Sequence, residues 1–344
     1  MAHILLAIFG ISLLMIVHEA GHYVMARATG MRVTTFSIGF GPALVRYRRR
    51  GSPTTFQLCL VPFLAYVRVA GSNPLEENDP KDSCLYENKS IGARALMLIG
   101  GPVANYVFAS IVVFGLALGG WREEVPTTPM ILAGVEAGSP ADGAGLRVGD
   151  VIVEVEGKTV QDVGEMSAIT SQRAGTPTRF TVEREGKPLP LTVIPRESGG
   201  RGVIGVTAKV ETRTRRLPVS EAAALAVELP WTLTAQNLEG MAGLVKHRST
   251  EGLTGPVGMV KQVATQAERG PFAYLSILVM ISVALGFFNL LPFPFLDGGR
   301  LLFLGYELVT ARRPNQNVEA IVHAAGMLLL LGMAALVTWR DILG

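Results

Sequence analysis

An uncharged stretch near the start of the chain constrains its fold more than any other feature. Residues 4–17 carry no charged side chain, and the apolar character continues to residue 26. A segment over about residues 3–26 is long enough to cross a bilayer as a helix. Residues 18–22 of this segment nevertheless read His-Glu-Ala-Gly-His. A charged group at that depth costs about 2.5–3.5 kcal/mol on insertion scales, so these groups need a compensating partner, and a metal ion is the natural candidate.

The spacing of the two histidines suits such a metal. On a helix, His18 and His22 lie on one face with their Cβ atoms about 5–6 Å apart, so both imidazoles can bind one Zn²⁺. Glu19 then lies where it can accept a proton from water at the metal. The pattern also arises by chance in helices that bind nothing. A cleaved signal peptide is a second alternative, but no Lys or Arg precedes the apolar run and no small-residue cleavage site follows it.

Composition agrees with a chain that is part membrane and part globular. Of the 344 residues, 49% are hydrophobic, and 31 basic against 28 acidic residues leave a net charge of +3. That charge is too small and too scattered to indicate nucleic acid binding. Cys59 and Cys84 form no Cys-x-x-Cys pair, so neither a thiolate zinc site nor a disulfide framework is expected.

Three more apolar segments predict further spans, over about residues 91–120, 272–288 and 318–337. Residues 1–120 then form the first half of a membrane core and residues 272–344 the second half. Positive charge gathers after the first span, at Arg27, Arg32, Arg46, Arg48, Arg49 and Arg50. By the positive-inside rule this side is cytoplasmic, which puts the histidine motif in the cytoplasmic half of its helix.

Residues 31–71 are rich in β-formers and predict a small sheet. The sheet follows the metal helix directly, so we expect it to lie in the membrane beside the site, with Tyr66 and Val67 on its last strand. Non-helical backbone is tolerated at that depth only where protein or a cavity surrounds it. A surface hairpin unrelated to the site is the alternative. Residues 72–90 read as a cytoplasmic loop.

A polar domain interrupts the membrane core. Residues 127–208 alternate short strands, turns and helices, and the string from Val135 to Ile152 closely resembles bacterial PDZ domains, which capture extended peptides. Residues 218–258 predict a membrane-associated helical linker that ends in a Gly/Pro turn at 253–258. We therefore expect a multi-pass α-helical membrane protein with four spans, a small membrane-associated β-sheet and an inserted α+β PDZ domain.

The segment that follows the third span contains the candidate for a third metal ligand. Pro292 and Pro294 cannot both lie inside a regular helix, so the chain breaks after Asn289 and delivers Asp297 on the cytoplasmic side. A zinc with two histidines needs a third protein ligand. Asp297 is the favoured candidate. His3 and His247 fall on the other side of the membrane, which leaves His323 as the rival.

The second span carries Gly100-Gly101-Pro102 and, one turn on, Asn105. Small residues let helices approach closely, and the Gly-Gly-Pro sequence is expected to kink or unwind the helix. Packing explains most of this segment, with a role for Asn105 in the site as the lesser alternative.

Together these residues resemble the RseP-type bacterial branch of the site-2 protease family of intramembrane zinc metalloproteases. The resemblance rests on the motif at 18–22, the strand at 36–41, Gly101-Pro102 with Asn105, the single PDZ domain, Gly255 to Gly258, and Asn289 to Gly299. It implies one zinc ion bound by His18, His22 and Asp297, with Glu19 as general base.

The resemblance also implies substrates and a location. Such enzymes cleave the transmembrane helix of single-pass proteins, for example a pre-trimmed anti-sigma factor or a remnant signal peptide, in the bacterial cytoplasmic (inner) membrane. The active site faces the cytoplasm and the PDZ domain is extracytoplasmic. An unwound substrate would pair with the strand at Tyr66 and Val67. The other expected substrate-binding residues are Asn289, Pro292, Pro294 and Asn105.

The chain departs from relatives in two places. Several relatives carry two PDZ domains, and relatives tend to have Gly-Gly where this chain has Leu64-Ala65, in the strand expected to pair with substrate. Two other function classes are the alternatives to this one. A non-catalytic PDZ scaffold would not need an intact Glu19, and a metal transporter would need neither a general base nor a peptide-binding domain.

Overall fold

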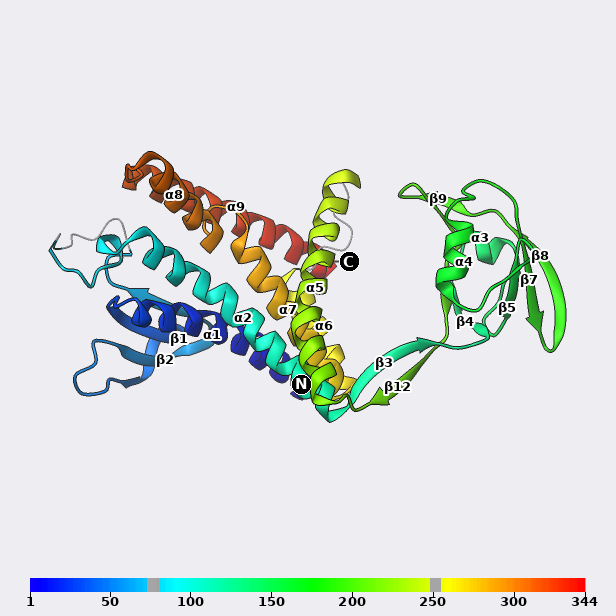
Figure 1. The fold of residues 1–344 in the computed structure, drawn as a ribbon, viewed down its shortest axis with the longest axis horizontal. Helices are drawn as coiled ribbons and strands as arrows, with labels where there is room; N and C mark the ends of the chain where they lie inside the picture. The colour runs from blue at the N-terminus through cyan, green and yellow to red at the C-terminus, as the bar shows by residue number, and fades with distance from the viewer. Residues whose placement is uncertain (73–78, 80, 248–254, 344) are drawn as a thin grey trace. The chain divides into compact units, whose positions relative to one another are not determined.

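A computed structural model describes residues 1–72, 79, 81–247 and 255–343 (Figure 1). The chain forms two compact units. The membrane unit comprises Met1–Gly119 and Leu217–Gly344, and the inserted unit comprises Gly120–Arg216.

The membrane unit is built mainly of long helices. Four of them are long and apolar enough to cross a bilayer, at Ala2–Ala28, Ile91–Gly120, Pro271–Leu290 and Asn317–Trp339. The predicted fold class, four spans with a small sheet and an inserted α+β region, is therefore confirmed. The helices of this unit are α1 (Ala2–Ala28), α2 (Ile91–Gly120), α5 (Val219–His247), α6 (Pro256–Glu268), α7 (Pro271–Leu290), α8 (Asp297–Thr310) and α9 (Gln316–Leu343), with a 3-10 turn at Tyr86–Asn88.

Two details of the helices differ from expectation. The Gly-Gly-Pro sequence does not unwind α2, which runs without a break past Pro102. The turn expected at 253–258 is wrong from Pro256 onward, because α6 begins there with proline in its first turn, where no N–H is missed; residues 253 and 254 lie outside the described residues. Val263 and Ala264 of α6 are buried in a core with Ala7, Leu14 and Leu278 of α1 and α7, which the sequence did not predict.

The small sheet consists of β1 (Val33–Tyr47) and β2 (Thr55–Val69). Residues 33–38 of β1 pair on one side with residues 65–69 and on the other with residues 55–58. Among the described residues, 65–69 have a β-partner on one side only, so they form an edge of the sheet. A core that includes Ala26, Val33, Val69, Leu98 and Leu304 joins this sheet to α1, α2 and α8.

The inserted unit is an α+β fold. Its sheet runs in the order β11-β4-β5-β7-β8, with β6 paired to β5, and a separate ribbon pairs β3 with β12. Met130, Ile152, Phe180, Val182 and other apolar side chains fill its core. Its elements are β3 (Trp121–Pro126), β4 (Met130–Val135), α3 (Pro140–Gly143), β5 (Val151–Val155), β6 (Lys158–Thr159), α4 (Val163–Thr170), β7 (Thr178–Arg184), β8 (Lys187–Val193), β9 (Arg196–Ser198), β10 (Arg201–Val203), β11 (Val206–Ala208) and β12 (Val210–Arg215).

Candidate metal centre

Three side chains from two distant parts of the chain meet in the membrane unit. His18 and His22 lie one turn apart on α1, and Asp297 is the first residue of α8. Their ligand atoms lie within 4.8 Å of one another. Both histidines are buried and the Asp297 side chain is 17% exposed. Asp297 reaches this position because α7 ends at Leu290, and the segment with Pro292 and Pro294 turns the chain before α8 begins.

The distances between these ligand atoms fit a tetrahedral metal. The Nε2 atoms of His18 and His22 are 3.2 Å apart, and they lie 3.2 and 3.3 Å from Oδ2 of Asp297. Zinc bonds of about 2.0–2.1 Å in a tetrahedron separate neighbouring ligand atoms by about 3.4 Å. Oδ2 of Asp297 is also buried without a hydrogen-bond partner among the described residues. Three donors that face one point, one of them a buried carboxylate oxygen left unpaired, are the arrangement that a bound cation satisfies.

A hydrogen bond to the backbone fixes the orientation of His22. Its Nδ1 lies 2.8 Å from the carbonyl oxygen of Met97 on α2, so Nδ1–H donates to that oxygen. In the neutral ring this leaves the lone pair of Nε2 for a metal. Histidine ligands of zinc in proteins are commonly held by such a second hydrogen bond.

The side chain of Asn105 lies beside Nδ1 of the other ligand, His18. Its amide lies 3.3 Å from Nδ1 of His18, while its own Oδ1 is buried without a described partner. When Nε2 binds a metal, Nδ1 carries the proton and needs an acceptor. Turning the amide end for end would let Oδ1 accept that proton.

Gly101 on α2 leaves the space that a metal needs. A Cβ atom there would lie 2.6 Å from Cε1 of His22 and 2.8 Å from Nε2 of His18. On α1, a Cβ on Gly21 would likewise collide with the backbone of Gly100 on α2. The small residues of α2 therefore bring its backbone against α1 at the level of the histidines.

Glu19 faces the sheet. Its Oε2 accepts a hydrogen bond of 2.9 Å from the backbone N–H of Val67, on the edge formed by residues 65–69. Glu19, His22, Tyr66, Val67 and Asp297 line one cavity of about 320 Å³. A carboxylate and the free edge of a β-strand thus border the space beside the ligand atoms.

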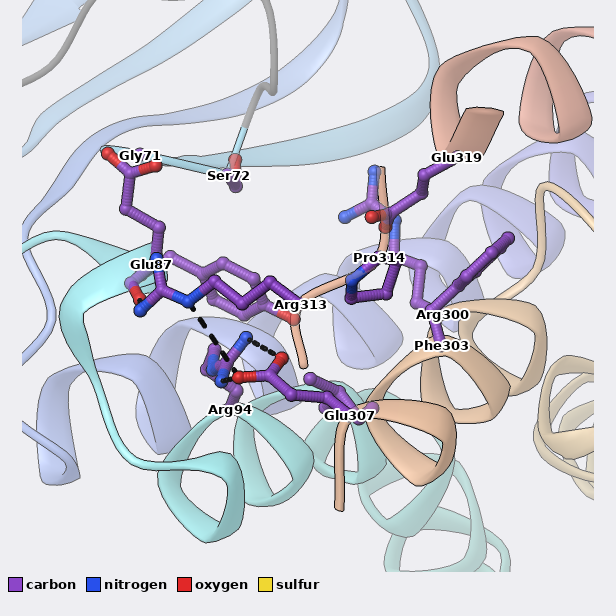
Figure 2. A pocket seen from close by; sticks show the side chains of 12 residues that line it. Gly71, Ser72, Glu87, Arg94, Arg300, Phe303, Glu307, Arg313, Pro314 and Glu319 are labelled. Carbon is purple, nitrogen blue, oxygen red and sulfur yellow. Dashed lines mark hydrogen bonds and ion pairs between the residues drawn. The ribbon is translucent and has the colours of Figure 1, made fainter. Parts of the chain in front are cut away.

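A second cavity of about 270 Å³ adjoins the first, and Ser72 and Arg300 line both. Figure 2 shows that charged side chains from α2, α8 and the α8–α9 connection gather around it. Arg94 and Glu307 form a buried two-point ion pair here, with N–O distances of 2.9 and 2.6 Å. Burial raises the pKa of Tyr86, another lining residue, to about 12. The ion pair ties α8, and hence Asp297, to α2.

The sequence model of peptidase family M50 matches residues 6–333. The chain belongs to peptidase family M50. It is 33% identical over 98% of its length to a candidate zinc metalloprotease of Mesorhizobium japonicum, of which 97% is covered. It is 30% identical over 97% of its length to metalloprotease MmpA of Caulobacter vibrioides, of which 94% is covered.

Among solved structures, this M50 peptidase is similar over part of its length to PDZ domains, two of which are the following. That of an SdrC-like protein from Listeria monocytogenes is 19% identical, with a TM-score of 0.22, and the match covers 25% of this chain and 93% of that one. That of HtrA3, bound to a phage-derived ligand, is 17% identical, with a TM-score of 0.18, and covers 27% and 92%.

Family and geometry together make the chain a multi-pass membrane zinc metalloprotease with a His-His-Asp metal site. The predicted class of enzyme, its zinc cofactor and its peptide substrates are confirmed at this level. The roles of the individual residues, including Glu19, stay predictions.

The residues expected to bind substrate in this M50 peptidase lie in four places, and Asn105 is described separately below. Tyr66 and Val67 line the metal cavity. Pro292 and Pro294 line a different, largely apolar cavity of about 480 Å³ with residues of α8 and α9. Asn289 donates to the carbonyl of Leu285 in its own helix, at 2.9 Å.

Asn105 is fully buried. Its contact with His18 favours a role in orienting that ligand over the predicted contact with substrate.

Leu64, one of the two residues that replace the Gly-Gly expected from relatives, has a strained backbone conformation. Its backbone has φ = 75°, a left-handed conformation that glycine adopts freely and leucine rarely does. A glycine at this position in relatives would therefore be unstrained. Here the strained residue stands directly before the edge at 65–69.

His323, the rival ligand, does not join the metal centre. Its Nδ1 accepts a hydrogen bond of 2.8 Å from the backbone N–H of Phe295, and the three-ligand group consists of His18, His22 and Asp297. No feature of the sequence indicated this contact, because it joins a helix to a loop 28 residues away.

Proposed function

We propose that this protein is an intramembrane endopeptidase that cleaves transmembrane segments of single-pass membrane proteins, such as pre-trimmed anti-sigma factors or remnant signal peptides. One observation carries the proposal. The His-His-Asp centre is built on a helix long and apolar enough to span a membrane, and the edge of a β-sheet lies beside it.

The chemistry follows from the groups around the cavity. When bound, zinc supplies Lewis acidity, which polarises the scissile carbonyl and makes water easier to deprotonate. Glu19 is the general base of the proposal. Its carboxylate accepts the proton of the attacking water and passes it to the nitrogen of the departing amine. His22 and His18 are held by Met97 and Asn105, so Glu19 works beside ligands whose rings are fixed.

The sheet edge meets the second requirement of such a reaction. A helical substrate hides its carbonyls in its own hydrogen bonds, so it must unwind before cleavage. The freed backbone groups then need partners, because water is scarce at this depth. Strand addition along residues 65–69, next to Tyr66 and Val67, would supply them. Asn289 would hold the unwound strand, and Pro292 and Pro294 would also contact the substrate.

The proposed orientation rests on charge. Arginines follow the first span in a cluster between residues 27 and 50, which favours the cytoplasmic side for the end of α1 that carries the motif. The protein would lie in a bacterial cytoplasmic membrane. The inserted unit, at the opposite end of α2, would be extracytoplasmic and would bind extended peptide segments as PDZ domains do.

Cleavage by the purified full-length protein in detergent tests the proposal. The substrate is a single-pass protein tagged at both ends, and wild type is compared with Glu19→Gln, with zinc measured in both. We expect wild type to cleave, and Glu19→Gln to be slower by about 10²–10⁴-fold while it keeps its zinc. Equal cleavage by both zinc-loaded proteins would contradict the role of Glu19. Absence of cleavage across a panel of transmembrane segments would favour a non-catalytic scaffold.

A further inference from the structure

The loop that delivers Asp297 is shaped by close contacts on both sides. Toward α8, a Cβ on Gly299 would lie 2.9 Å from the carbonyl carbon of Phe293. Toward α9, a Cβ on Gly326 would lie 2.7 Å from the carbonyl oxygen of Pro294. Phe293 and Pro294 are thus contacted by the start of α8, and Pro294 also by one face of α9.

One residue of this loop is in a strained conformation. Phe295 has φ = 80°, in the left-handed region that a bulky side chain rarely occupies. Such a conformation persists only where its surroundings hold it. Phe295 stands two residues before Asp297 and lines the metal cavity with it, so a relaxation of its backbone would move the ligand.

His323 supplies the contact that holds this backbone. Its Nδ1 accepts the N–H of Phe295 at 2.8 Å. The ring lies 5.5 Å from that of Phe303 on α8, centroid to centroid, and the side chain is 16% exposed. Phe303 and Glu319 border the cavity shown in Figure 2. Oε1 of Glu319 is 3.9 Å from Nε2 of His323, too far for a hydrogen bond, so the bond to Phe295 is the polar contact that fixes the ring.

We propose that His323 is a positioning residue for the metal centre: through the N–H of Phe295 it holds the strained loop that presents Asp297 to the zinc. It acts through the loop and not as a ligand. His323 and Gly326 lie on the same face of α9, so this helix sets the position of Asp297 although it contributes no ligand. The inference rests on the metal site and does not depend on which substrate is cleaved.

The test separates the hydrogen bond from simple packing. His323→Phe keeps a ring against Phe303 and removes the acceptor, whereas His323→Asn keeps an acceptor near the place of Nδ1 and removes most of the ring. His3→Phe, in the first turn of α1 and far along this helix from His18, is the matched control. For each zinc-loaded full-length protein in detergent, the rate of zinc release to a chelator is measured, together with the absorption spectrum of the Co²⁺-substituted form.

We expect His323→Phe to release zinc at least about 10-fold faster than wild type, as loss of a supporting contact does at metal sites, with an altered Co²⁺ spectrum. His323→Asn and His3→Phe should behave as wild type. Release from His323→Phe at the wild-type rate, or release from His323→Asn as fast as from His323→Phe, would overturn the proposal.

A second variant relieves the backbone strain at Phe295. Glycine adopts φ = 80° freely, so His323→Phe/Phe295→Gly should hold zinc longer than His323→Phe alone. If His323→Phe yields no folded protein, the double variant decides: recovery of folded, zinc-binding protein supports the proposal, and failure to recover contradicts it.

Discussion

The membrane unit and the inserted unit both have apolar cores, but they differ in the other side chains that they bury and expose. In the membrane unit His18, Arg94 and Asn105 are buried, whereas large apolar side chains such as Ile111 and Leu328 are about two-thirds exposed, at 65% and 67%. In the inserted unit the buried side chains are mainly apolar, as in an ordinary water-soluble core. The contrast indicates lipid around one unit and water around the other.

The difference also changes what holds each unit together. In lipid, contact between apolar side chains of two helices gains no hydrophobic free energy. Membrane helices therefore associate through close packing of small residues and through polar contacts. Gly21 against Gly100 and the Arg94–Glu307 pair are contacts of these two kinds. The inserted unit instead buries apolar side chains away from water. Substitutions that act on packing or on polar pairs should therefore have their largest effects in the membrane unit.

The largest effect on zinc binding is expected at Gly101. Gly101→Ala would place a methyl group against the ligand nitrogens of His18 and His22. Overpacking of this kind costs about 1–3 kcal/mol, so zinc affinity should fall by about 10–100-fold. Gly115→Ala is the matched control on the same helix, because a Cβ there meets nothing within 4 Å. Competition with a zinc chelator measures both, and equal affinities in the two variants would exclude the steric role given to Gly101.

A second prediction concerns the buried ion pair. Arg94→Met leaves Glu307 buried with only the exposed Arg313 side chain, 3.8 Å away, as an ion partner, which should destabilise the membrane unit by about 3–5 kcal/mol. The double variant Arg94→Met/Glu307→Met should recover most of that loss. Arg300→Met, on the same helix as Glu307 and without an ion pair among the described residues, is the control. Unfolding in detergent with increasing denaturant measures the three, and a single variant as stable as the control would show that the pair contributes little.

A smaller loss of stability than that of Arg94→Met is expected in the inserted unit. Asp150 is buried and accepts hydrogen bonds from the Arg184 guanidinium at 2.7 and 2.8 Å, which lowers the pKa of Asp150 below its usual value. The stability that this carboxylate contributes is therefore present above the pKa of an unfolded aspartate, about 3.9, and is lost as the pH falls below it. Arg184→Leu should remove most of this pH dependence and cost about 2 kcal/mol.

Hydrogen exchange of β7 amides in the full-length protein, between pH 6 and pH 3, checks this expectation. Arg179→Leu, an exposed arginine on the same strand, should keep the pH dependence of wild type. A β7 strand that opens equally easily in wild type and Arg184→Leu across the range would refute the role assigned to the pair.

Local patterns predicted much of the membrane unit. The i, i+4 spacing fixed the relation of His18, Glu19 and His22, because it lies within one helix. The two prolines located the break before Asp297. Helix α6 was not predicted, although Val260, Val263, Ala264 and Ala267 recur at helical spacing. Its burial comes from contacts with α1 and α7.

The supporting contacts of the site could not be predicted in the same way. Arg94 and Glu307 are 213 residues apart, and neither has a local pattern that names its partner. Asn105 and Gly101 appeared in the sequence as packing residues of α2. Their relation to the histidine rings depends on the rotation of α2 against α1, which only the packed structure fixes.

The most direct test is to locate the cut bond. The protein is reconstituted in lipid vesicles with a single-pass substrate, and the products are identified by mass spectrometry for wild type and Glu19→Gln. The account predicts a cut inside the apolar segment of the substrate with wild type and none with Glu19→Gln. A cut confined to the water-exposed flanks, or the same cut with Glu19→Gln, would contradict hydrolysis at a zinc centre within the membrane.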